Sequence, residues 1–239
     1  MTHTTPIPLR ILGIFAHPDD AEFTVAGSMA LWAGQGAQIT YVIVTDGGAG
    51  SNDPALSRAE LTRIRQAEQT AACALLGVQE ALFLGYPDGV LEPTLGLRRD
   101  LTSIIRRLKP NRVLCGDPSV LFYGDGYINH PDHRAAAEAA LYAVFPSAPT
   151  RPIFPELLAE GLEPHKVKEV YMTSDSAHVN TYVDITSTIE RKVEALRCHK
   201  SKVDPGDGQW LRNWAAEDGK AGGMPYAEAY RVMKLFEDQ

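Results

Sequence analysis

The stretch LRILGIFAHPDDAEFTVAGSMALWAGQGAQITYVIVT, residues 9–45, decides the fold. Its first part, Leu9 to Ala16, is mostly apolar and predicts a buried strand. Ala21 to Ala33 is typical of a helix, and the β-branched segment Gln38 to Thr45 predicts a second strand. Short connections between buried strands favour a parallel sheet with helices on its faces. The chain therefore opens as a β-α-β unit of an α/β protein.

The rest of the chain continues this alternation of helix-like and strand-like segments. The 239 residues fit a single domain, residues 1–239, better than two independent ones. Five prolines predict an irregular insertion near residues 145–165, and a loop followed by a helix forms a C-terminal extension from residue 203. The predicted helices are 55–76, 94–108, 131–144, 186–198 and 227–236, and the further strands are 81–84, 112–115, 167–172 and 181–184.

Charge and composition exclude several classes of partner. A formal net charge of -7 and a pI of about 5.5 provide no basic footprint for nucleic acid or for an anionic membrane surface. No segment approaches the ~20 apolar residues of a membrane span, and residues 1–8 lack the pattern of a signal peptide. The three cysteines are far apart, which fits buried or half-buried thiols in a reducing compartment. We therefore expect a cytoplasmic protein.

The first polar cluster, His17-Pro18-Asp19-Asp20-Ala21-Glu22, follows the first strand and begins a helix. Ligands of open parallel sheets sit beyond the carboxyl ends of the strands, so this is where chemistry is expected. An imidazole and three carboxylates this close together need a cation or hydrogen bonds to compensate their charge. Acids that favour the helix dipole would explain each carboxylate singly, but not His17 beside all of them. His17 and Asp20 flank a tight turn and both suit Zn²⁺.

The second polar cluster, Asn129-His130-Pro131-Asp132-His133, begins another helix, with Pro131 at its first position. His133 would project from the first turn as a third metal ligand, because a catalytic zinc commonly has three protein ligands and a water. His130 is then left to bond a reacting oxygen, and Asp132 to orient the imidazole of His130. A lone histidine would more often cap or pack locally, but two histidines and an aspartate together favour a site.

These two clusters together resemble the LmbE-like family, also called the PIG-L family of N-acetylglucosaminyl deacetylases. The family pattern is His-Pro-Asp-Asp with a nearby Glu, followed later by His-x-Asp-His. Weaker similarities continue through the chain at Thr45-Asp46-Gly47, Arg65 to Glu68, Leu76-Gly77-Val78, Tyr86 to Gly89 and His199-Lys200-Ser201.

The resemblance implies a Rossmann-like, mostly parallel sheet flanked by helices, and zinc-dependent hydrolysis of an N-acetyl or related amide, often on an amino sugar. It implies that the metal ligands are His17, Asp20 and His133. Asp19 would be the general base and His130 would stabilise the oxyanion. Arg65 and Asp88 match positions that contact the sugar. The metal is expected to be Zn²⁺, with Fe²⁺ or another divalent ion left open.

Several alternatives stay open at this stage. The same chemistry could act on a thiol conjugate or another small N-acyl amine, and a non-catalytic sugar- or metal-binding protein is a weaker interpretation, because Asp19 and His130 are not needed to hold zinc. A dinucleotide-binding oxidoreductase would need G-x-G-x-x-G after the first strand, where this chain has acids. Trp210 and Trp214 favour packing over a sugar platform. A homo-oligomer is also left open.

Overall fold

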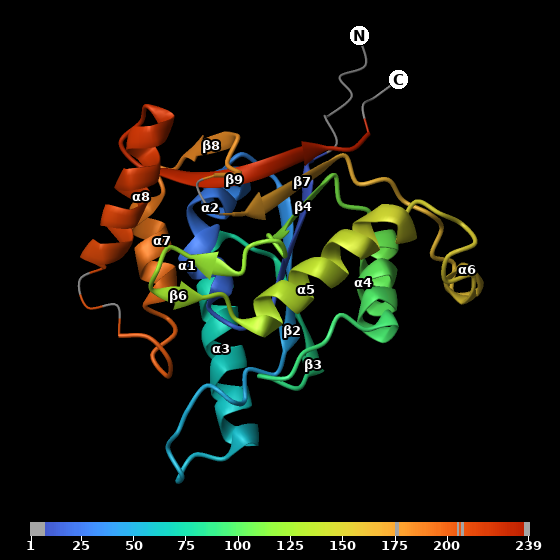
Figure 1. Ribbon diagram of the computed structural model, residues 1–239, viewed down its shortest axis with the longest axis horizontal. Helices are drawn as coiled ribbons and strands as arrows, with labels where there is room; N and C mark the ends of the chain where they lie inside the picture. Colours follow the sequence, from blue (N-terminus) through green and yellow to red (C-terminus); the bar gives the residue numbers. More distant parts are fainter. Residues whose placement is uncertain (1–7, 175–176, 205, 207, 237–239) are drawn as a thin grey trace.

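The structure is a computed structural model that describes residues 8–174, 177–204, 206 and 208–236. A seven-stranded sheet in the order β3-β2-β1-β4-β7-β9-β8 forms its centre (Figure 1). The first five strands of this order run parallel, and β9 runs antiparallel to both of its neighbours. The predicted α/β class with a mostly parallel sheet is therefore confirmed. Of residues 1–8, which were predicted not to be a signal peptide, residues 1–7 lie outside the described residues.

The strands and helices follow one another along the chain much as the alternating sequence pattern predicts. The strands are β1 (Arg10–Phe15), β2 (Gln38–Thr45), β3 (Glu80–Tyr86), β4 (Arg112–Gly116), β5 (Phe122–Tyr123), β6 (Tyr127–Ile128), β7 (Glu169–Thr173), β8 (Thr181–Asp184) and β9 (Ala227–Lys234). The helices are α1 (Asp20–Thr24), α2 (Ala26–Gly34), α3 (Arg58–Leu76), α4 (Leu95–Leu108), α5 (Pro131–Tyr142), the π-helical turn η1 (Ala143–Ser147), α6 (Glu156–Ala159), α7 (Ile189–Leu196) and α8 (Gln209–Gly222).

Two apolar layers cover the two faces of the sheet. Side chains alternate along β1, so Leu12 and Ile14 pack with α4 and α5, whereas Ile11 and Phe15 pack with α2 and α3. Figure 1 shows α4 and α5 on one side of the strands and α1, α2, α3 and α7 on the other. Both faces of β1 and β2 are buried, which explains why their sequences read as nearly continuous apolar runs.

The strand order fixes where a ligand can bind. After β1 the chain adds β2 and β3 on one side, and it then returns to add β4 and β7 on the other. The connections after β1 and β4 therefore leave in opposite directions and open a crevice at the carboxyl ends of these strands. The first polar cluster follows β1 and the second begins α5, which places both at this crevice.

The C-terminal prediction was wrong in two places. The segment 227–236 was predicted as a helix, but Ala227–Lys234 is strand β9, and α8 occupies Gln209–Gly222 where a long loop was expected. Alanine, glutamate, methionine and lysine favour helices, yet β9 pairs with β7 on one side and β8 on the other. Backbone pairing on two edges outweighs a propensity of a few tenths of a kcal/mol per residue.

Smaller differences concern element boundaries. The helix predicted at 21–33 is two helices that meet at Val25. The Pro-rich stretch contains the π-helical turn η1 and the short helix α6, and the loop before α5 contains the β5–β6 hairpin. Within the described residues, no helix is long and apolar enough to cross a membrane. All three cysteines are described, and each is a free thiol, as expected.

Candidate active site

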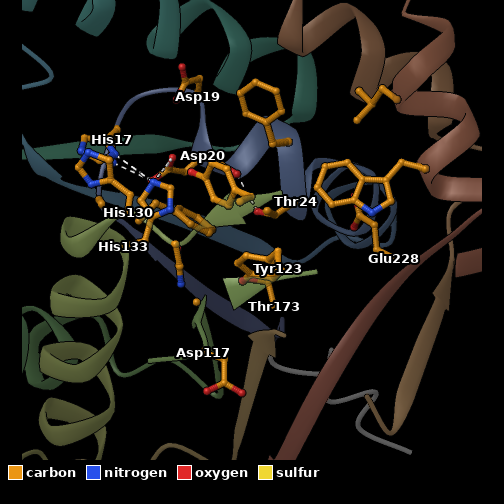
Figure 2. A pocket seen from close by; sticks show the side chains of 18 of the residues that line it. His17, Asp19, Asp20, Thr24, Asp117, Tyr123, His130, His133, Thr173 and Glu228 are labelled. Atoms are coloured by element: carbon orange, nitrogen blue, oxygen red, sulfur yellow. Dashed lines mark hydrogen bonds and ion pairs between the residues drawn. The ribbon is translucent and has the colours of Figure 1, made fainter. Parts of the chain in front are cut away.

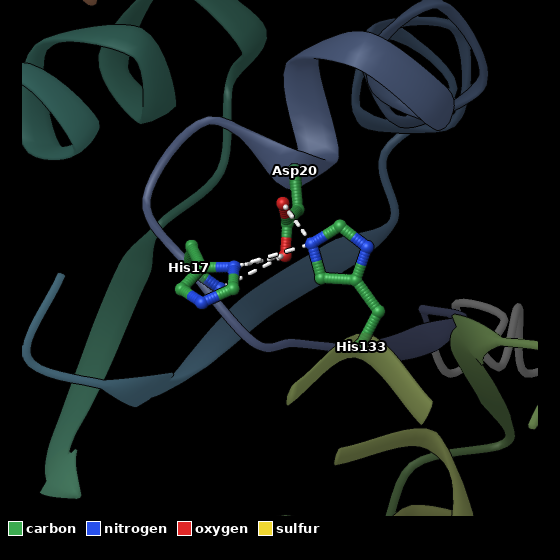
Figure 3. Close-up of side chains that lie close together, drawn as sticks. All are labelled: His17, Asp20 and His133. Carbon is green, nitrogen blue, oxygen red and sulfur yellow. Dashed lines mark hydrogen bonds and ion pairs between the residues drawn. The ribbon is translucent and has the colours of Figure 1, made fainter. Parts of the chain in front are cut away.

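The three predicted metal ligands meet at the crevice. His17 follows β1, Asp20 begins α1, and His133 projects from the first turn of α5 (Figure 3). His133 Nε2 lies 3.2 Å from His17 Nδ1 and 3.1 Å from Asp20 Oδ1. His17 Nδ1 lies 3.6 Å from Asp20 Oδ2. One ligand atom from each residue lies within 4.8 Å of the others, so this group could hold a metal ion.

The other ring nitrogen of His17 faces two carboxylates. His17 Nε2 lies 3.0 Å from Asp88 Oδ1 and 3.1 Å from Asp132 Oδ2. This leaves Nδ1 as the nitrogen that points toward Asp20 and His133. A ligating histidine almost always donates its second N–H to a carboxylate or carbonyl, which fixes its tautomer and ring orientation. The surroundings of His17 therefore have the form expected of a metal ligand.

A second group, His17, His130 and Asp132, also brings its ligand atoms together. Asp132 is fully buried, and its oxygens already accept the backbone N–H groups of Gly89 at 2.7 Å and Leu91 at 3.0 Å. An ion there would compete with these bonds and with His17. The group of His17, Asp20 and His133 is therefore the better candidate for a cation.

The charges around His17 indicate that the site needs positive charge. Burial alone would lower the pKa of His17, but the charge of Asp20 and hydrogen bonds to Asp132, Asp20 and Asp88 raise it to about 12. Burial would likewise raise the pKa of Asp20, but the charges of His133 and His17 hold it well below its usual value. Three carboxylates thus compete for one imidazolium, and a bound divalent cation would satisfy them better than a proton. The residues present fit a divalent metal.

Asp19 lies beside this group but has different partners. Its carboxylate accepts a hydrogen bond from Arg65 Nη2 at 3.2 Å, and it is almost completely buried. Burial and the charge of Asp20 raise the pKa of Asp19 to about 6, against the opposing charge of Arg65. A carboxylate with a pKa near neutrality is suited to accept a proton and return it.

His130 packs edge-on against His17, with the two ring centroids 4.8 Å apart. It caps α5, because His130 Nδ1 accepts the backbone N–H of Asp132 at 3.2 Å. The proton of a neutral His130 ring is therefore on Nε2. Burial and the charge of His17 lower the pKa of His130, which favours the neutral ring.

The structure also places Asp132 differently from the sequence-based expectation. Asp132 was predicted to orient His130, but His130 Nδ1 and Asp132 Oδ1 are 4.0 Å apart. The carboxylate instead bonds His17 and the loop after β3, through the N–H groups of Gly89 and Leu91. The backbone N–H of Asp132, rather than its carboxylate, contacts the His130 ring.

Arg65 and Asp88, the predicted sugar contacts, both line the cavity and are both largely buried. Arg65 donates to the carbonyls of Gly47 and Pro18 as well as to Asp19. Asp88 accepts the backbone N–H of Ala49 at 2.9 Å and bonds His17. In the structure their partners are therefore groups of the protein, and they support the residues that flank the metal group.

A cavity of about 1340 Å³ extends from the histidines toward α8 (Figure 2). Its aromatic lining includes Phe23, Tyr182, Trp210 and Trp214. Trp210 and Trp214 remain 41% and 49% exposed, and the Trp210 ring lies 5.8 Å from that of Phe23. Neither tryptophan is therefore buried in the core, and packing at an interface and contact with a sugar both stay predictions for them. We call this aromatic part of the cavity the aromatic arm.

Sequence reasoning missed one buried network behind Asp19. The two carboxylate oxygens of Glu22 bond Gln69 Nε2 and His199 Nε2. The available signal was the spacing of Gln69, which lies one helical turn after Arg65 and thus on the same face of α3.

Comparison with known proteins gives one consistent result. Residues 12–144 match the family model PIG-L, described as GlcNAc-PI de-N-acetylase. The chain is 33% identical over 235 residues to a diacetylchitobiose deacetylase of Thermococcus kodakarensis, which covers 94% of this chain and 83% of that protein. It is 30% identical over 264 residues to a 1D-myo-inositol 2-acetamido-2-deoxy-alpha-D-glucopyranoside deacetylase of Actinosynnema mirum, covering 94% and 87%.

A solved structure shows the same relationship. The N,N'-diacetylchitobiose deacetylase of Pyrococcus horikoshii, complexed with an inhibitor, superposes with a TM-score of 0.86 and 31% identity, over 94% of this chain and 84% of that one. The match includes both polar clusters, since the family model spans His17 to His133. The chain belongs to the PIG-L family of de-N-acetylases.

Proposed function

We propose that this protein is a zinc-dependent hydrolase that removes the N-acetyl group from an amino sugar or an amino-sugar conjugate. The observation that carries the proposal is the group of His17, Asp20 and His133 with a buried carboxylate, Asp19, directly beside it. The relatives named above are deacetylases of substrates that contain N-acetylated glucosamine units. A protein that only held a metal would have no use for a carboxylate with a pKa of about 6 beside the site.

Zinc is the proposed metal because two imidazoles and one carboxylate are a set of three protein ligands typical of catalytic zinc. When bound, zinc supplies Lewis-acid polarisation of the amide carbonyl and lowers the pKa of a water molecule toward ~7. Fe²⁺ uses the same donors, so metal content decides between them.

The residues of the chain supply the proton transfers. Asp19 accepts a proton from the attacking water as the water adds to the amide carbon, and it then donates that proton to the departing nitrogen. Arg65 holds the Asp19 carboxylate in place during both steps. His130 donates its Nε2–H to the carbonyl oxygen as negative charge develops there, because its Nδ1 is already an acceptor. One oriented donor of this kind is typically worth about 2.7–4 kcal/mol.

The aromatic arm supports a substrate larger than one sugar ring. A cavity of about 1340 Å³ exceeds the roughly 300–1,000 Å³ of a typical small-ligand pocket. Aromatic faces such as Trp210 suit the apolar face of a second ring or an apolar aglycone. We propose that the acetamido group reaches His130 and Asp19 while the remainder of the substrate lies along this arm.

The test is an acetate-release assay on N-acetylglucosamine, diacetylchitobiose and N-acetylglucosaminyl conjugates. We expect turnover that a chelator removes and added zinc restores. Asp19→Asn should retain bound zinc and lose at least about 1,000-fold in kcat, because both proton transfers lose their carrier. Turnover that survives complete metal removal, or full activity of Asp19→Asn, would contradict the proposal. Thiol-conjugated and other N-acyl amines belong in the same screen, since they test the alternative substrate classes.

A further inference from the structure

The backbone of Asp19 has a conformation that few residues other than glycine adopt. Its φ is 99° and its ψ is -27°, in the left-handed region, where an L side chain meets its own backbone. Glycine would adopt this conformation readily, but glycine has no carboxylate. The conformation must therefore be held by surrounding contacts, because local preference works against it.

A buried chain of side chains supplies these contacts. Gln69 Oε1 accepts the backbone N–H of Asp19 at 3.0 Å, and Gln69 Nε2 donates to Glu22 Oε1 at 3.0 Å. The other carboxylate oxygen of Glu22 lies 3.0 Å from His199 Nε2. All three side chains are almost completely inaccessible to solvent. The network therefore runs from the amide of Asp19 to a histidine from a distant part of the chain.

The amide at position 69 meets two opposite requirements. The Asp19 N–H needs an acceptor, and the Glu22 carboxylate needs a donor, so a side chain between them must accept at one atom and donate at another. The loop also closes on itself, because the backbone N–H of Glu22 donates to the carbonyl of Asp19 at 2.9 Å. Asp19 is thus held at its N–H by Gln69 and at its carbonyl by the first turn of α1.

Helix α3 supports both ends of Asp19. Arg65 reaches the carboxylate, and Gln69, one turn later, reaches the backbone N–H. The neighbouring Glu68 accepts the backbone N–H of Ser201 at 2.8 Å and its hydroxyl at 2.6 Å. These bonds fix the segment that carries His199 against the same helix.

We propose that Gln69, Glu22 and His199 are positioning residues that hold Asp19 in its left-handed conformation and thereby aim its carboxylate at the reacting water. The proposal rests on the proposed function for the role of Asp19 as base. None of the three residues touches the reacting atoms, so their effect is on kcat through Asp19, with substrate binding left largely intact.

The decisive experiment exchanges the Gln69 amide and the Glu22 carboxylate, which face each other. Gln69→Glu sets a second carboxylate against Glu22 and removes the donor between them, and we expect kcat to fall about 100-fold with KM changed by less than about threefold. Glu22→Gln combined with Gln69→Glu restores the bonds that link Asp19, position 69, position 22 and His199. In this double variant, the carboxylate now at position 69 accepts from the Asp19 N–H and from the amide now at position 22, and the oxygen of that amide accepts from His199. The double variant should regain kcat to within about fivefold of the original protein.

Two further variants separate positioning from general stability. Gln69→Met keeps the side-chain volume and removes the bonds to Asp19 and Glu22, and it should lower kcat about as much as Gln69→Glu does. Gln79 is a matched control, because its Oε1 accepts the backbone N–H of Ile39 and its Nε2 donates to the carbonyl of Gly77, at the opposite end of the sheet. Gln79→Met should leave kcat unchanged even if the midpoint of thermal unfolding falls.

Amide hydrogen exchange measured by NMR gives a readout without activity. The Asp19 N–H should be protected in the original protein and in the double variant, and should exchange at least about tenfold faster in Gln69→Met. Failure of the double variant to recover both protection and kcat would overturn the proposal, as would normal kcat in Gln69→Met. If the original protein hydrolysed none of the N-acetyl substrates while this exchange pattern held, the proposed function would fail and the positioning of Asp19 would stand.

Discussion

At the scale of single residues, His17 shows how one side chain connects the metal group to the fold. Its Nδ1 faces Asp20 and His133, and its Nε2 faces Asp88 and Asp132. The two carboxylates come from the loop after β3 and from α5, so elements distant in sequence fix one ring. A change at either carboxylate should therefore act on metal affinity before it acts on the sugar.

Asp88→Asn tests this effect on metal affinity, because it replaces one carboxylate oxygen by an NH₂ group. Replacing a carboxylate that orients a metal-ligating histidine typically lowers metal affinity 10–100-fold, and we expect about 10-fold because Asp132 remains. Competition with a chromogenic zinc chelator measures this affinity. Asp100→Asn is the control, since its carboxylate bonds the hydroxyl of Tyr86 and does not line the cavity. Unchanged zinc affinity with a raised KM would instead support the sugar contact implied by the family resemblance.

His133→Ala removes a proposed ligand outright. We expect zinc content to fall from about one ion per chain to a small fraction, because two protein ligands rarely retain a catalytic zinc. Elemental analysis after gel filtration measures the stoichiometry. His165→Ala is the matched control, because His165 bonds the carbonyl of Pro110 and is not among the residues that line the cavity. A full zinc complement in His133→Ala would exclude His133 as a ligand.

The sequence predicted which residues meet, but not all of their partners. His17, Asp20 and His133 come together as expected because each is fixed by local sequence, at a strand end or in a first helical turn. The partners of Asp132 depend on the N–H groups of Gly89 and Leu91, whose positions follow from the tertiary structure. Gln69 was likewise missed, because its spacing from Arg65 indicates a shared face of α3 but not the groups that its amide contacts.

At the scale of secondary-structure elements, the parallel core was predictable and the antiparallel edge was not. Apolar runs such as residues 9–16 predict a strand directly, because both faces of such a strand are buried. In β9, a buried glutamate interrupts the pattern: Glu228 accepts from Lys192 at 2.6 Å and from the backbone N–H groups of Gly27 and Ser28. This ion pair joins β9, α7 and α2, and its meaning is visible only in three dimensions.

Lys192→Met should destabilise the protein strongly. The substitution leaves the buried Glu228 carboxylate without its cation, and removal of one partner of a buried pair costs about 3–5 kcal/mol. We expect a loss of stability at the lower end of this range, because Gly27, Ser28 and Tyr230 still donate to Glu228. Urea unfolding monitored by circular dichroism measures the change, with exposed Lys220→Met as control. A loss below about 1 kcal/mol would show that the ion pair contributes little.

At the scale of the whole molecule, the fold builds the site from two regions of the chain. The metal group lies at the carboxyl ends of β1 and β4, and the C-terminal elements α7, α8 and β9 border the same cavity through residues such as Lys192, Trp210 and Glu228. All seven long strands share one sheet, so we propose that the chain is one domain whose C-terminal part determines which substrates fit. The family resemblance predicted the reaction because its motifs are local. We propose that substrate size depends on α8, whose residues line the cavity.

Substitution of Trp210 tests whether the C-terminal part of the chain determines which substrates fit. It lies against Phe23 of α1, one helical turn after Asp19, so the aromatic arm begins close to the proposed base. Loss of a stacking face worth about 1 kcal/mol should raise KM roughly fivefold for a substrate that reaches it. We therefore expect Trp210→Ala to raise KM for diacetylchitobiose and to leave KM for N-acetylglucosamine within about twofold.

The control for Trp210→Ala is Trp210→Phe, which keeps an aromatic face and should lose little with either substrate. Steady-state acetate release with both substrates measures the two ratios. An equal loss for the single sugar and the disaccharide would mean that Trp210 supports the fold of α8 instead of contacting a second ring. A selective loss would mean that chemistry and substrate size are set by separate regions, since the metal group and Asp19 are unchanged in both variants.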